Sequence, residues 1–150
     1  WDTQNQEKKT FKKAEENIKI MFGHMNYAPI LPISAKEDTG IKQLLNTVIE
    51  LYNQLNRKID TASLNTALRD WVTAYPPPAS RSASFKMRYI TQTSVNPVEF
   101  LIFATRPEVV QQTYLSYIKN KVRTDLGFDK IPVKVELKAS RTKWENRSRT

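Results

Sequence analysis

The first 58 residues contain two stretches in which apolar side chains recur at helical spacing. In residues 11–22 they lie three or four positions apart among Lys and Glu, and the pattern stops near Gly23. Between the two stretches, the apolar run 30–33 predicts a buried strand, and Pro29 and Pro32 favour a strand end or a sheet edge for it. Both stretches predict amphipathic helices, and the second has a longer stripe made of Ile41, Leu44, Leu45, Val48, Ile49, Tyr52 and Leu55.

Three strands are predicted after residue 58. Residues 85–90 alternate, with Phe85, Met87 and Tyr89 expected on the buried face, whereas 98–104 is almost continuously apolar and suits an internal strand. The polar segment between them predicts a turn. A third alternating run, 133–138, predicts the last strand.

Two further helices separate these strands. One is expected to begin with Thr61 as its cap and to end at the three prolines 76–78. The other is expected to open at a capping box formed by Thr105 and Glu108 and to end at Gly127 in a left-handed conformation. The order helix, strand, strand, helix, strand predicts an α+β fold with both helices on one face of a three-stranded sheet, whose strand order stays open.

Composition narrows the class of protein. The chain has 150 residues, 39% apolar and 26% charged, which is typical of a soluble globular protein with one ordinary domain or two small ones. Cysteine is absent, which excludes disulfides, thiolate zinc sites and a Cys nucleophile. The sequence has no run of about 18 apolar residues, and its first 25 residues are too polar for a signal peptide. We therefore expect a cytoplasmic protein that does not act at a membrane.

The formal net charge of +9 is unevenly placed. Residues 1–58 carry 9 basic and 7 acidic side chains, whereas residues 59–150 carry 15 and 8. An excess of this kind favours a polyanionic partner, in practice nucleic acid, although an anionic membrane surface or a merely solvated basic surface would also explain it. The candidate RNA contacts in the second half are Lys86, Arg88, Lys119, Lys121, Arg123, Lys134, Lys138 and, in a predicted basic tail, Arg141, Lys143, Arg147 and Arg149.

Other polar and aromatic residues receive structural interpretations. We expect Tyr89, Tyr114 and Tyr117 to pack in the core with a polar tip, and not to form a base-stacking platform. Asp125 and Asp129 lie near a predicted helix end and a turn, which favours a local structural role over an acid/base pair. No set of nucleophile, base and orienting group is recognisable, so we predict no catalytic residue and no metal site.

Local strings along nearly the whole chain resemble the C-terminal part of the bacterial tandem G-domain GTPases called EngA or Der. The loop Ser34-Ala35-Lys36 and the opening Trp1-Asp2 resemble the two guanine-reading motifs of G domains. Asn96, Thr105 and Lys130 depart from the family pattern. The residues that match it are Thr61, Leu64, Asn65, Leu68, Pro76 to Pro78, Tyr89, Thr91, Gln92, Pro97, Phe100, Phe103, Pro107, Tyr114, Tyr117, Asn120, Arg123, Gly127, Phe128, Ile131 and Pro132.

The resemblance implies a division into three parts. Residues 1–58 would be the C-terminal remnant of a second P-loop G domain, residues 59–138 a KH-like domain and residues 139–150 a basic tail. Asp2, Ser34, Ala35 and Lys36 would read guanine in the intact parent, which would use GTP and magnesium. The three glycines are too far apart for a phosphate-binding loop, so we expect no cofactor and no GTPase activity in this fragment itself.

Two functions follow as hypotheses. The first is the RNA- or ribosome-docking fragment of a ribosome-assembly GTPase, with ribosomal RNA or the large ribosomal subunit and the G domains of the same polypeptide as partners. A Gly-x-x-Gly clamp, by which ordinary KH domains hold nucleotides, is absent, so binding through the usual KH groove is not expected. The alternative is a stand-alone RNA-binding or protein-interaction module without a GTPase parent.

Overall fold

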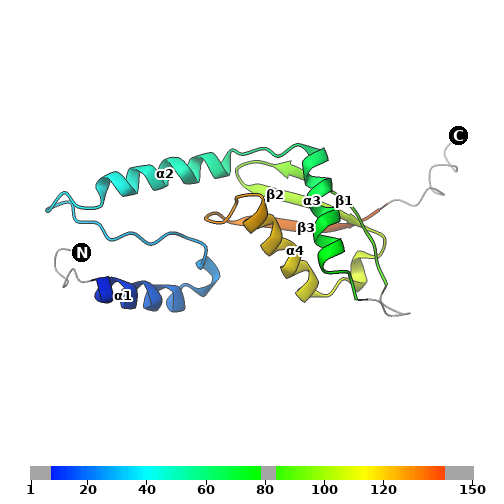
Figure 1. Ribbon diagram of the computed structural model, residues 1–150, viewed down its shortest axis with the longest axis horizontal. Helices are drawn as coiled ribbons and strands as arrows, with labels where there is room; N and C mark the ends of the chain where they lie inside the picture. Colours follow the sequence, from blue (N-terminus) through cyan, green and yellow to red (C-terminus); the bar gives the residue numbers. More distant parts are fainter. Residues whose placement is uncertain (1–7, 79–83, 141–150) are drawn as a thin grey trace, which may run out of the picture. The chain divides into compact units, whose positions relative to one another are not determined.

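The computed structural model describes residues 8–78 and 84–140 and is shown as a ribbon in Figure 1. The chain divides into two compact units. Among the described residues, the first contains 8–55 and 129–132, and the second contains 56–78, 84–128 and 133–140.

The first unit contains the two amphipathic helices that the sequence predicts. Helix α1 spans Lys8–Met21, a 3₁₀ turn η1 follows at Gly23–Met25, and α2 spans Ile41–Leu55. The apolar stripe of α2 is largely exposed, with Tyr52 at 66% and Leu45 at 58% of full exposure. The apolar pattern therefore predicted the helix correctly, but it wrongly implied that the side chains of the apolar stripe are buried.

The strand predicted for residues 30–33 is wrong. These residues have no regular secondary structure, and the adjacent bridge joins Ser34 to Thr39 instead. Pro29 and Pro32 lack the N–H that a ladder needs, and none of the three described strands pairs with this run. At the end of this run, a local turn between Ser34 and Thr39 supplies the backbone hydrogen bonds. Gly40 closes that turn with a φ of +77°, where an added Cβ would meet the carbonyl oxygen of Pro32.

The second unit is the α+β layer that the sequence predicts. Helices α3 (Thr61–Ala74) and α4 (Gln112–Asp125) cover one face of a sheet built from β1 (Met87–Ser94), β2 (Val98–Ala104) and β3 (Val133–Ala139) (Figure 1). The spatial order is β1-β2-β3, with β1 antiparallel and β3 parallel to β2. The sheet is therefore mixed, which the sequence left open.

The core of this unit lies between the helices and the sheet. Alternate residues of β2 are buried, as expected for a central strand with one covered face. Phe100 packs edge-on against Phe128 with ring centroids 5.6 Å apart. The core side chains of the second unit are Leu64, Leu68, Trp71, Phe85, Ile90, Val98, Phe100, Ile102, Ala104, Tyr114, Ile118, Val122, Phe128 and Val133.

A bulge in β1 overturns the predicted facing of its side chains. Met87 pairs with Ala104 and Tyr89 with Phe103, so one extra residue lies between Met87 and Tyr89 while their partners are adjacent in β2. The extra residue, Arg88, shifts the alternation by one position. Ile90 is consequently buried and Tyr89 is exposed, the reverse of the prediction.

Helix ends show where local sequence rules succeeded and failed. The cap of α3 is Asp60, whose carboxylate accepts from the Ser63 N–H at 2.9 Å, and not Thr61. A hydrogen bond from the Ser63 side chain, followed by this backbone bond, lowers the pKa of Asp60. The predicted capping box is also wrong, because the Thr105 hydroxyl accepts from the Lys86 N–H and a 3₁₀ turn, η2 (Pro107–Val109), precedes α4. Gly127 does end α4 with a φ of +73° as predicted.

Candidate nucleic-acid interface

Lys134 and Lys138 lie on the face of the sheet that the helices leave open. Both belong to the same alternating set of β3, so their side chains lie on one face of the strand, and Val133 and Val135 lie on the other face, toward the helices. Lys134 contacts Glu136 at 2.7 Å and Glu99 at 3.5 Å, and the hydrogen bond to Glu136 raises the pKa of Lys134. The positive charge of Lys134 is thus partly neutralised. Lys138 makes no ion pair with any residue that the structure describes.

Tyr89 lies on the same open face and stacks on Phe103. Their ring centroids are 4.4 Å apart and the rings are nearly parallel at 11°. Tyr89 is 43% exposed, so the expected core position is wrong for this tyrosine, whereas Tyr114 is buried and Tyr117 half-buried as predicted. Because the bulge at Arg88 is not visible in the apolar pattern, sequence reasoning could not place Tyr89 correctly.

Lys86 precedes the bulge and Arg88 is its extra residue, and both side chains are exposed. The Lys86 backbone pairs with Thr105, which fixes the entry into β1. Arg88 lines a groove of about 520 Å³ between α3 and β1. Arg69 of α3 lines the same groove, and the sequence analysis did not single it out. Arg69 becomes a candidate contact only because β1 lies beside α3, which brings it to the groove that Arg88 also lines.

The basic side chains of α4 have different environments. Lys119 is exposed, whereas Lys121 is half-buried and lies 3.3 Å from the Asp125 carboxylate. Arg123 is half-buried in the last turn, where its carbonyl accepts from the Phe128 N–H at 2.9 Å. The structure therefore does not bring all predicted RNA contacts onto one surface.

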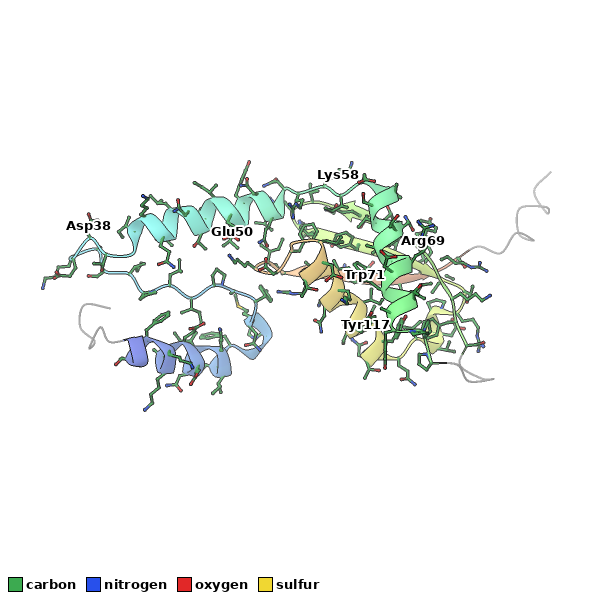
Figure 2. All side chains as sticks on the ribbon, viewed as in Figure 1. Asp38, Glu50, Lys58, Arg69, Trp71 and Tyr117 are labelled. Carbon is green, nitrogen blue, oxygen red and sulfur yellow. The ribbon has the colours of Figure 1, made fainter. Side chains whose placement is uncertain are left out.

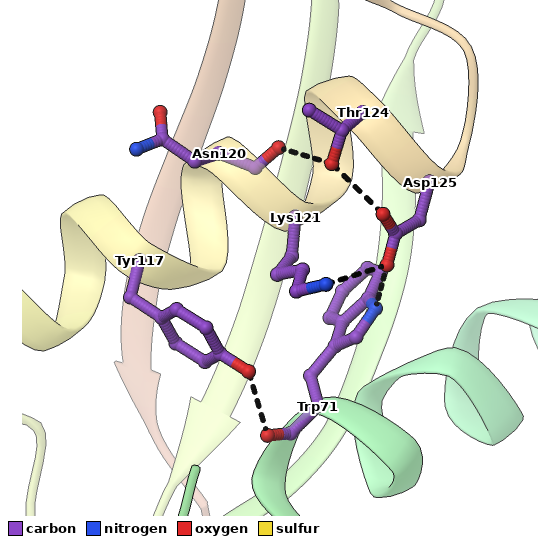
Figure 3. Close-up of polar contacts among 6 residues, drawn as sticks. All are labelled: Trp71, Tyr117, Asn120, Lys121, Thr124 and Asp125. Carbon is purple, nitrogen blue, oxygen red and sulfur yellow. Dashed lines mark hydrogen bonds and ion pairs between the residues drawn. The ribbon is translucent and has the colours of Figure 1, made fainter. Parts of the chain in front are cut away.

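Asp125 connects α4 to α3 in a small polar cluster (Figure 3). Its carboxylate accepts hydrogen bonds from the Thr124 hydroxyl and from Trp71 Nε1, both at 2.8 Å. The bond from Thr124, followed by those from Trp71 and Lys121, lowers the pKa of Asp125. The Tyr117 hydroxyl donates to the Trp71 carbonyl at 2.9 Å. Both carboxylate oxygens of Asp125 have partners within the fold, which agrees with the predicted helix-end role.

Gln54 of α2 binds the segment 129–132 within the first unit. Its Nε2 donates to Asp129 Oδ1 at 2.8 Å, and its Oε1 accepts from the Lys130 N–H at 3.2 Å. Lys130 also contacts Glu50 at 2.6 Å, which raises the pKa of Lys130. Lys130 was noted only as a departure from the family pattern, and this contact gives the lysine a structural role.

The predicted guanine-reading residues are only partly described. Ser34 is 3% exposed; it pairs with Thr39 through two 3.0 Å backbone bonds, and its hydroxyl accepts from the Glu37 N–H. Ala35 and Lys36 are exposed at the tip of this turn (Figure 2 labels the neighbouring Asp38). Asp2 lies outside the described residues. The Ser34–Thr39 pair thus closes the turn that carries the exposed Ala35 and Lys36.

Within residues 8–78 and 84–140, no cluster of His, Asp or Glu could hold a metal ion, and these ranges supply no phosphate-binding loop. The described residues therefore do not fit a bound GTP with magnesium. No helix in the described part is long and apolar enough to cross a membrane. The tail candidates Arg141, Lys143, Arg147 and Arg149 lie outside the described residues.

Comparison with known proteins identifies the family. Residues 58–138 match the family model described as the KH-domain-like region of EngA bacterial GTPase enzymes, C-terminal. The chain belongs to the EngA family. It is 41% identical over 138 residues to GTPase Der of Treponema pallidum, which covers 92% of this chain and 30% of the relative. For GTPase Der of Caldanaerobacter subterraneus the identity is 33%, with 92% and 31% covered.

A third relative, GTPase Der of Brevibacillus brevis, is 35% identical over 90% of this chain and 31% of its own length. The chain thus spans about a third of the length of the curated relatives it matches. These matches confirm the resemblance to the EngA family that the local strings predicted. They also agree with the α+β layer of the second unit.

Proposed function

We propose that this EngA-family chain is the RNA-docking C-terminal portion of a GTP-binding factor that assembles the large ribosomal subunit. The observation that carries the proposal is the match of residues 58–138 to the EngA KH-like region, combined with the concentration of positive charge after residue 58. Residues 59–138 are the docking domain in this proposal, and residues 139–150 are a basic arm.

Residues 1–58 are, in the same proposal, the end of the second G domain of a cytoplasmic parent. Ser34, Ala35, Lys36 and Asp2 would then contribute to guanine recognition when the rest of that domain supplies the phosphate and magnesium contacts. Hydrogen bonds worth about 1 kcal/mol each do not by themselves offset an association cost of roughly 4–15 kcal/mol. The chain alone accordingly does not hold GTP in this account.

Contacts to RNA phosphates should make the affinity of this chain for RNA strongly salt-dependent. We expect binding to fragments of large-subunit ribosomal RNA, with a slope of log affinity against log salt of several units, because each contact adds about 0.7–0.9. Fluorescence anisotropy across a salt series measures this slope. An affinity that salt does not change, or the absence of binding at low salt, would contradict the proposal.

A further inference from the structure

The groove between α3 and the edge strand β1 has the chemistry of an anion site. Its apolar lining includes Leu68, Val72 and Met87, and Arg69 and Arg88 line it from the helix and the strand. Figure 2 shows Arg69 on α3. The volume of about 520 Å³ lies within the range of roughly 300–1,000 Å³ that holds small ligands.

Both arginines of the groove are available to a ligand. Arg69 and Arg88 are exposed, and neither makes an ion pair with a residue in the described ranges. Arg69 is held by a 3.1 Å hydrogen bond to the Thr66 hydroxyl. No described Asp or Glu lines the groove. Two arginines that form no ion pair with a described residue, beside an apolar lining, favour an anion that also has an apolar surface, because Arg binds phosphate in a planar fork and stacks on flat rings.

Asn65 argues against an added peptide strand at this edge. Its Oδ1 accepts from the Ile90 N–H and its Nδ2 donates to the Ile90 carbonyl, both at 3.0 Å. These two groups face the outer edge of β1, where a peptide strand would have to pair with them. A nucleic-acid strand needs no such backbone partners, since its phosphates bind arginine and its bases contact apolar surface.

We infer that the α3–β1 groove is a subsite for unpaired RNA, in which Arg69 and Arg88 bind phosphates and the apolar lining takes the face of a base. The inference rests on the proposed RNA-docking function and names the part of the fold that would bind the RNA. It differs from the predicted set of contacts in naming Arg69 and in separating Arg88 from the cations of the open sheet face. The small groove fits a short unpaired segment and not a duplex.

The test compares two doubly substituted variants of the 150-residue chain. Arg69→Gln with Arg88→Gln removes the groove cations, and Lys12→Gln with Lys42→Gln removes the same charge from exposed sites in the first unit. Each is titrated against a short labelled single-stranded RNA and against the same sequence as a duplex. Circular dichroism checks that both variants fold as the unsubstituted chain does.

The groove variant should lose about 25-fold in affinity for single-stranded RNA at about 0.1 M salt, with a slope smaller by about 1.4, because each contact contributes about 0.7 for single strands. The control variant should keep its affinity and its salt slope within about twofold of those of the unsubstituted chain, because the two lysines that it lacks do not line the groove. Ala62→Trp narrows the groove without changing charge and should also weaken binding, which a diffuse basic surface would not show.

Three results overturn the groove inference while leaving RNA docking intact: equal affinities of the groove and control variants, an equal loss for duplex RNA, or full affinity in Ala62→Trp. A glutamate-rich peptide that binds the unsubstituted chain, loses affinity in the groove variant and leaves RNA binding unchanged would overturn it in favour of a protein partner. If the unsubstituted chain binds no RNA at any salt concentration, the proposed function fails as well.

Discussion

Replacing Phe100 with Ala is expected to lower the free energy of unfolding of the second unit by about 3–5 kcal/mol. Phe100 is 1% exposed on the central strand and packs edge-on against Phe128. The substitution removes a buried ring and leaves a cavity between the sheet and the helices. Since small domains have total stabilities of about 5–15 kcal/mol, a loss of this size removes a large share of the fold. Urea unfolding followed by circular dichroism measures it.

Phe103→Ala provides the matched control because it removes the same ring from the same strand. Phe103 is half-buried on the open face, where it stacks on Tyr89. We expect a loss of only about 1 kcal/mol there, from the aromatic pair and partial burial. Equal losses for the two substitutions would contradict the assignment of the covered and open faces of the sheet.

Asn65→Leu is expected to destabilise the second unit by about 2–4 kcal/mol, although the two side chains are similar in size. Asn65 satisfies both backbone groups of Ile90, a residue with no exposed surface, and also donates to the Thr61 carbonyl at 2.7 Å. Removing the amide leaves a buried N–H and a buried C=O without partners. Urea unfolding gives the total loss, and hydrogen exchange at the Ile90 amide reports the site.

Asn65→Asp separates the two halves of this interaction. The carboxylate can still accept from the Ile90 N–H but cannot donate to the Ile90 carbonyl or to Thr61. We expect a loss of stability smaller than that of Asn65→Leu, with the Ile90 amide still protected from exchange. An Ile90 amide that exchanges as slowly in Asn65→Leu as in the unsubstituted chain would contradict the role given to this side chain.

Elements with a strong local signal were predictable from the sequence. Helix α2 follows a long apolar stripe, β2 a continuous apolar run, and the end of α4 a glycine at φ +73°. Features that depend on neighbours in space were not. Residues 30–33 have the apolar pattern of a strand but no described strand to pair with, so they do not form one.

The candidate site was less predictable than the fold, for two physical reasons. A one-residue bulge at Arg88 turns Tyr89 outward and Ile90 inward, and an apolar pattern with period two contains no sign of it. Arg69 is one exposed cation among many until α3 packs beside β1 and brings it to the groove that Arg88 lines. Charge distribution favours a polyanionic partner, whereas the residues of the proposed groove could be chosen only from the tertiary fold.

Binding to ribosomal particles tests the central proposal most directly. The unsubstituted 150-residue chain is centrifuged through a cushion with purified large ribosomal subunits, with small subunits in parallel, at several salt concentrations. The account predicts saturable co-sedimentation with the large subunit that weakens as salt rises, because RNA phosphates carry the interaction. A chain that stays in the supernatant at low salt, or that pellets equally with both subunits, would contradict it.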